Sequence, residues 1–173
     1  MRGAVDDAAR SLNGIIKVIG IGQSLRGDDA AGLSAVRLWV DTCPAQVSHP
    51  RVNVELAELP GVGLLNLLEG ARFAILVDAV QSGGIPGTIY QLNEGQLESF
   101  ALGSASAHGW GVAETLSLGR QLAPASLPGE LIVIGVETGQ LDLGKTISPE
   151  VESCLPEVAR LIEQFVNTAL LQS

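Results

Sequence analysis

Three side chains that could bind a metal ion lie in separate segments of the sequence. Asp29 lies in the loop GIGQSLRGDDAAG, Asp78 lies near the end of the apolar run FAILVDAV, and His108 lies in the small-residue stretch GSASAHGW. Two carboxylates and one imidazole form a mixed oxygen and nitrogen ligand set, which suits zinc or nickel better than calcium or magnesium. Such a set leaves a coordination position open for water or substrate.

The loop that holds Asp29 does not match the nucleotide-binding motifs it first suggests. A dinucleotide-binding fingerprint needs a third glycine where Leu25 stands, and a P-loop needs a lysine where Asp28 stands. Two adjacent carboxylates would repel a phosphate group. The loop therefore indicates a cationic ligand, and we expect Asp28 to cap the following helix.

Other catalytic arrangements find less support in the sequence. No GxSxG motif is present, which argues against an α/β-hydrolase serine. Cys43 and Cys154 are far apart and form no CxxC motif, so we expect two reduced thiols in a cytoplasmic protein. His49 lies in a polar stretch, and we interpret it as a surface loop residue.

Strand and helix patterns alternate along the chain and would position these residues. Apolar or alternating runs predict strands at 15–21, 51–58, 73–80, 87–92 and 131–137. Helical spacing predicts helices at 30–40, 61–70 and 110–122, and a last helix that opens near 148–150, with Pro156 marking a late start or a kink. The alternation predicts an α/β layer fold with a mostly parallel sheet, whose ligand sites form beyond the carboxyl ends of the strands.

Length and composition limit the number of domains and the classes of partner. The 173 residues fit one domain over 1–173, with 1–13 as a ragged lead-in, and 46% hydrophobic residues predict a substantial core. A net charge of −9 without a basic cluster argues against nucleic acid and membrane as partners. No apolar run approaches the roughly 20 residues that span a bilayer. We expect a monomer that docks transiently on a larger protein.

The motifs in their order resemble those of a known family. GIGQSLRGDDAAG, ILVDAV, SAHGWG, VIGVETG and SPEV before a final helix are similar to the motifs of the nickel–iron hydrogenase maturation endopeptidases, over about residues 15–170. The resemblance implies a five-stranded, twisted, mostly parallel sheet with helices on both faces. It also implies that Asp29, Asp78 and His108 are the metal-recognising and catalytic residues.

An activity follows from the same resemblance. Such enzymes remove a C-terminal extension from the large-subunit precursor of the hydrogenase after nickel has been inserted. The resemblance implies that the three residues recognise nickel presented by the substrate, so that the free protein holds no metal tightly. The general base stays open, with Asp28 or a ligand aspartate as candidates.

Two other functions remain as alternatives. One is a self-contained metallohydrolase with its own zinc. The other is a non-catalytic metal-binding or nucleotide-binding module on a Rossmann-like scaffold.

Overall fold

A five-stranded sheet forms the centre of the molecule in the computed structural model, which describes residues 14–101 and 111–172. The strand order is β2-β1-β3-β5-β4; β1, β2, β3 and β5 run parallel and β4 is antiparallel to β5. The strands are β1 (Ile16–Gly22), β2 (Val52–Glu58), β3 (Phe73–Val80), β4 (Ile89–Asn93) and β5 (Glu130–Glu137). The predicted strands and the mostly parallel α/β class are confirmed.

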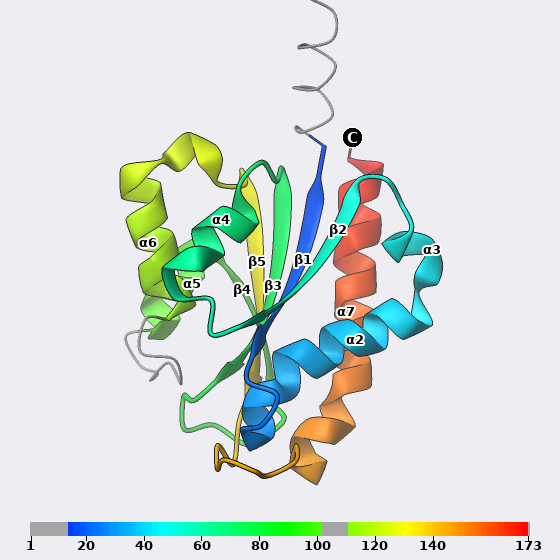
Figure 1. Cartoon of the computed structure of the whole chain (residues 1–173), viewed down its shortest axis with the longest axis vertical. Coiled ribbons are helices and arrows are strands. Elements are labelled where there is room, and N and C mark those ends of the chain that lie inside the picture. Colours follow the sequence, from blue (N-terminus) through cyan, green and yellow to red (C-terminus); the bar gives the residue numbers. More distant parts are fainter. Residues whose placement is uncertain (1–13, 102–110, 173) are drawn as a thin grey trace, which may run out of the picture.

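Helices cover both faces of the sheet (Figure 1). The helices α2 (Ala31–Thr42) and α7 (Pro149–Leu171) pack on one face, and α4 (Leu64–Leu68), α5 (Glu94–Ala101) and α6 (Val112–Leu122) pack on the other. The short α3 (Pro44–Val47) follows α2, and short 3-10 turns lie at η1 (Gly27–Ala30), η2 (Gly61–Gly63) and η3 (Pro124–Ser126). The sequence patterns did not indicate α3 or α5, which are short.

Buried residues on both faces explain the continuous apolar runs of the central strands. Val18 and Ile75 belong to the core beneath α2 and α7, whereas Ile19 and Leu76 belong to the core beneath α4, α5 and α6. Because successive side chains of a strand point to opposite faces, each run supplies both cores.

For the last helix, the sequence predicted either a late start at Pro156 or a kink there. Helix α7 starts at Pro149 and continues through Pro156, so a late start at Pro156 is wrong. Apolar residues on both sides of Pro156, such as Val151 and Val158, are fully buried. Their packing opposes the cost of the backbone hydrogen bond that proline removes.

Two further features belong to this description. Within residues 14–101 and 111–172, no helix is long and apolar enough to cross a membrane. The predicted lead-in 1–13 lies outside the described residues, so that prediction and the prediction of one domain over 1–173 stay predictions.

Candidate functional site

The loops that follow β1, β3 and β5 meet at the carboxyl edge of the parallel strands (Figure 1). Glycine lets helix α2 begin directly against this edge. A Cβ atom added at Gly32 would lie 2.2 Å from the carbonyl oxygen of Val77 and 2.4 Å from that of Ile21. The segment just before α2 is therefore held against the ends of β1 and β3.

Asp78 lies near the carboxyl end of β3, with 6% of its surface exposed. Its Oδ1 accepts the backbone N–H of Ala79 at 2.9 Å. Asp78 lines a narrow pocket, whose other walls come from the end of β1, the η2–α4 segment and the start of α6. These lining residues are Ile21, Pro60, Gly61, Leu64, Gly111, Val112 and Thr115.

Asp29 lies in η1, between β1 and α2, and is fully buried. Its carbonyl oxygen accepts the backbone N–H of Gln23 at 3.4 Å. A Cβ atom added at Gly22, the last residue of β1, would lie 2.0 Å from that oxygen. Because η1 also packs against β3, the segment that holds Asp29 lies at the same sheet edge as Asp78. Asp29 is not among the residues that line the Asp78 pocket.

His108 lies outside the described residues, so the structure does not place it. Gly111, three residues later in the sequence, lines the same pocket as Asp78. In the described part of the chain, His, Cys, Asp and Glu form no group of three or more that could hold a metal ion.

Asp28 has a different role from its sequence neighbour. Its Oδ2 accepts the backbone N–H groups of Gly139 and Gln140 at 2.8 and 2.9 Å, and its Oδ1 accepts that of Ser148 at 2.6 Å. Helix α2 has no side-chain cap, so the prediction that Asp28 caps it is wrong. The carboxylate instead joins η1 to the segment between β5 and α7, a contact that local sequence cannot show.

The hydrogen bonds of Asp28 determine its protonation. Burial alone would raise the pKa of this carboxyl, but the N–H donors of Ser148, Gln140 and Gly139 outweigh burial and place the pKa below its usual value. Asp28 is therefore an anion whose two oxygens are occupied. This arrangement argues against the idea that Asp28 serves as the general base.

A second buried carboxylate, Glu137, holds another loop at this edge. Glu137 ends β5 and is 1% exposed; its Oε1 accepts the backbone N–H groups of Ser82, Gly83 and Gly84 at 2.9, 3.0 and 3.1 Å. Its Oε2 accepts the Ser82 hydroxyl at 2.5 Å. Sequence reasoning missed this role, although an acidic residue at the end of the apolar run 131–137 was a usable signal.

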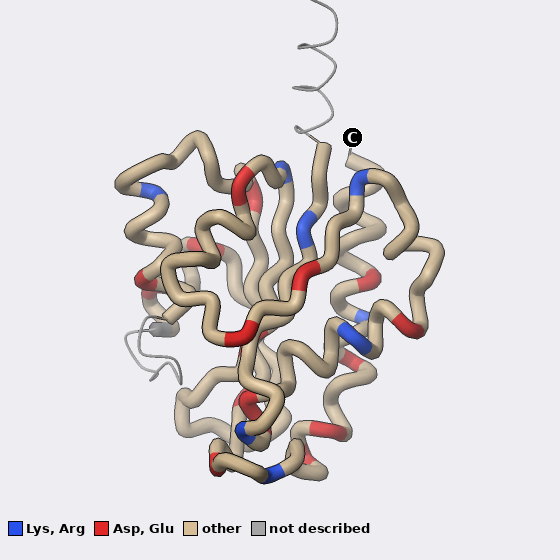
Figure 2. The backbone as a smooth tube through the Cα atoms, viewed as in Figure 1, with Lys and Arg blue, Asp and Glu red and all other residues tan. Residues whose placement is uncertain are grey.

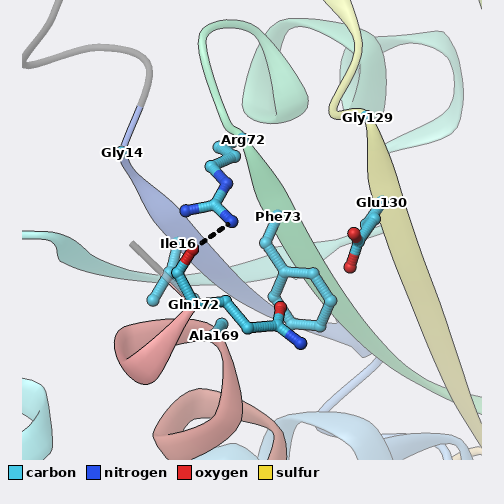
Figure 3. A pocket seen from close by; sticks show the side chains of 8 residues that line it. All are labelled: Gly14, Ile16, Arg72, Phe73, Gly129, Glu130, Ala169 and Gln172. Atoms are coloured by element: carbon cyan, nitrogen blue, oxygen red, sulfur yellow. Dashed lines mark hydrogen bonds between the residues drawn. The ribbon is translucent and has the colours of Figure 1, made fainter.

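A different pocket lies at the opposite, amino-terminal edge of the sheet (Figure 3). Residues at the starts of β1, β3 and β5 line it together with the end of α7, and Arg72 donates a hydrogen bond to the carbonyl oxygen of Gln172 at 3.0 Å. Ligand sites of parallel sheets form at the carboxyl edge, so this pocket is not the candidate site.

The charged residues of 14–101 and 111–172 show no pattern of a nucleic-acid interface. The Lys and Arg residues of the described chain are spread over the molecule and do not gather on one element (Figure 2). His49 lies between α3 and β2 and is half-buried, and its Nδ1 accepts the backbone N–H of Arg51 at 3.2 Å. Its interpretation as a loop residue is confirmed.

Fold and site together define a class: a doubly wound α/β protein with carboxylates at strand ends, where dinucleotide-binding proteins of this architecture have phosphate-binding glycines. Comparison with known proteins narrows this class. The family model HycI, described as hydrogenase maturation protease, matches residues 46–165. The hydrogenase expression/formation protein HupD of Thiocapsa roseopersicina is 30% identical over 162 residues, which cover 88% of this chain and 68% of that protein.

Solved structures show the same fold. The hydrogenase maturating endopeptidase HybD from E. coli superposes with a TM-score of 0.76 at 23% identity, covering 90% of this chain and 93% of that one. The [NiFe] hydrogenase maturation protease HybD from Thermococcus kodakarensis superposes with a TM-score of 0.69 at 24% identity, covering 88% and 99%.

The chain belongs to the hydrogenase maturation protease family. It is a hydrogenase maturation endopeptidase, and its family processes the hydrogenase large-subunit precursor, a nickel-containing substrate. The family, the α/β fold with helices on both faces and the peptidase activity expected from the sequence are confirmed.

Proposed function

We propose that this endopeptidase recognises nickel already bound in the large-subunit precursor, through Asp29, Asp78 and His108, and then removes the C-terminal extension. The observation that carries the proposal is the position of Asp78. Its carboxylate is buried at the carboxyl edge of the sheet, in a pocket that it shares with Gly111, just after the segment that holds His108. Asp29 comes from the neighbouring segment η1.

The reaction is peptide-bond hydrolysis. A water oxygen attacks the scissile carbonyl carbon, the C–N bond breaks, and the water protons leave on the new carboxyl and amine groups. Nickel bound by the substrate could either polarise the carbonyl or lower the pKa of the attacking water. With Asp28 occupied by three N–H donors, Asp29 or Asp78 is the remaining carboxylate at the site that could accept the proton.

The proposal also covers the metal content of the free enzyme and the cellular compartment in which it acts. Nickel is part of the substrate, so the free protein holds no metal tightly. Cys43 and Cys154 are both free thiols, which is usual in the reducing cytoplasm. We therefore place the reaction there, with the enzyme acting as a monomer.

Processing of a precursor with and without nickel tests the proposal. The wild-type enzyme should shorten the nickel-loaded large subunit, seen as a mass loss, and should leave the nickel-free form intact. His108→Ala should abolish the mass loss while the circular dichroism spectrum stays unchanged. The matched control is His49→Ala, which changes the second histidine of the chain and should keep processing.

Two results would contradict the proposal. Full processing by His108→Ala would remove His108 from the site. Stoichiometric zinc in the purified wild-type protein would favour the alternative of a self-contained metallohydrolase.

A further inference from the structure

Exposed apolar side chains gather in the loops around the candidate site. In residues 14–101 and 111–172, eight large hydrophobic side chains are exposed. Five of them lie in loops at the carboxyl edge and are between 51% and 80% exposed: Leu25, Leu59, Val62, Ile85 and Leu143. We call these five residues the apolar arc.

Hydrogen bonds and contacts join most of the loops that form the apolar arc. Ser24, beside Leu25, donates its hydroxyl hydrogen to Glu58, beside Leu59. The N–H of Gly144, beside Leu143, bonds the carbonyl oxygen of Leu25 at 2.8 Å. The apolar side chains of these loops are thus held on neighbouring segments rather than scattered.

The loop that holds Ile85 also contacts one of these loops. A Cβ atom added at Gly139 would lie 2.9 Å from Cγ of Pro86, so the loop after β3 touches the loop after β5. Glu137 fixes the loop after β3 from within through the N–H groups of Ser82, Gly83 and Gly84. The exposed Ile85 therefore projects from an anchored loop.

One residue of the apolar arc is kept in a costly conformation. Leu59 has φ +50°, the only positive φ of a non-glycine residue in the described part of the chain. A left-handed conformation costs a residue with a Cβ atom of the order of 1 kcal/mol or more. The Leu59 side chain is half exposed. Backbone strain of this kind gathers at functional sites.

The apolar arc is continuous with the pocket of Asp78. Pro60 and Gly61, which lie between Leu59 and Val62, both line that pocket. Leu59 and Val62 are therefore the sequence neighbours of residues that form the pocket wall. Clustered exposed apolar side chains are typical of protein–protein contacts.

We propose that the apolar arc is the docking surface for the hydrogenase large-subunit precursor, and that it binds an apolar region of that protein next to the cleaved segment. This inference rests on the proposed function, because it assumes that the precursor is the substrate. The arc supplies binding energy, while the residues at the strand ends supply the chemistry.

Paired variants and a matched control test the inference. The arc variants are Leu59→Asn with Val62→Ser, and Ile85→Ser with Leu143→Ser. Asparagine tolerates the left-handed conformation better than leucine, so the first pair should fold at least as well. The control is Leu122→Ser with Leu171→Ser, which removes two exposed leucines at the ends of α6 and α7. Thr115 is the last residue of α6 that lines the pocket, and the helical rise from Thr115 places Leu122 about 10 Å further along the helix.

Affinity and kinetics are measured with the nickel-loaded precursor. Each arc variant should weaken precursor binding to the immobilised enzyme by at least about fivefold and raise KM with kcat unchanged. The control variant should stay within about twofold of wild type. Melting temperatures establish that every variant is folded.

The possible results separate the inference from the proposed function. Arc variants that bind and process as the control does would overturn the docking surface, as would a wild-type enzyme that does not bind the precursor. A wild-type dimer in sedimentation that the arc variants convert to monomers would assign the arc to a second copy instead. If wild type binds the precursor but does not shorten it, and the arc variants bind it more weakly, the docking surface stands and the proposed function fails.

Discussion

The Oδ1 atom of Asp28 accepts the backbone N–H of Ser148 at 2.6 Å, although 120 residues separate the two in the sequence. Ser148 is the residue before α7, so this bond fixes the start of the last helix against η1. The neighbouring Asp29 shares the backbone that this contact holds. The contacts of Asp28 thus fix the segment that also holds Asp29.

Asp28→Asn should lower the free energy of unfolding by about 2–3 kcal/mol. An amide keeps one acceptor oxygen, so an N–H donor on one side of the side chain would face an NH₂ group. Urea denaturation measures the loss. The matched control is Asp142→Asn, an exposed aspartate in the segment between β5 and α7, which should change stability by less than about 0.5 kcal/mol. Equal stability of the two variants would contradict the role of Asp28.

The protonation of Asp28 predicts how stability changes in acid. Its pKa in the folded protein lies below the unfolded value of 3.8. The ionised carboxylate therefore stabilises the fold above the unfolded pKa, and this contribution is lost as the pH falls through the lower folded pKa. Urea titrations between about pH 6 and pH 2 should show a steeper loss of stability for wild type than for Asp28→Asn. Parallel curves for the two proteins would show that Asp28 has no such linkage.

The sequence predicted the elements that depend on local pattern. The central strands were recognisable because buried β-branched residues such as Val18 and Ile75 form continuous runs. Asp78 was recognisable as a candidate because a carboxylate within such a run carries a desolvation cost that calls for a reason.

Contacts between distant loops could not be predicted in the same way. Asp28 and Ser148, or Glu137 and Ser82, meet only when the sheet brings their segments to one edge. The sequence pattern also predicted that Asp28 caps the following helix, because an aspartate just before a helix is typical of an N-cap. Its actual partners lie more than 100 residues away.

Glu137→Gln should loosen the loop that follows β3. The amides of Ser82, Gly83 and Gly84 all donate to one oxygen of Glu137, and a neutral amide accepts such bonds more weakly than a carboxylate. Hydrogen exchange of these three amides should become at least about tenfold faster. Glu130→Gln, at the exposed opposite end of the same strand, is the control and should leave these rates unchanged. Unchanged exchange in Glu137→Gln would mean that other contacts hold the loop.

Gly32→Ala should destabilise the protein by about 3 kcal/mol, because the added methyl group would overlap the carbonyl oxygens of Val77 and Ile21 at 2.2 and 2.4 Å. Both partners are backbone atoms of central strands, so they cannot move aside as a flexible side chain could. Thermal unfolding measures the effect.

The control for this variant is Gly63→Ala. No atom lies within 4 Å of a Cβ added there, and the helical backbone of φ −60° suits alanine. Gly63→Ala should leave the melting temperature unchanged or raise it slightly, because alanine restricts the unfolded chain. A Gly32→Ala protein that melts with the control would show that α2 can move away from the strand ends. In that case Asp29 would not be held at the edge where Asp78 lies.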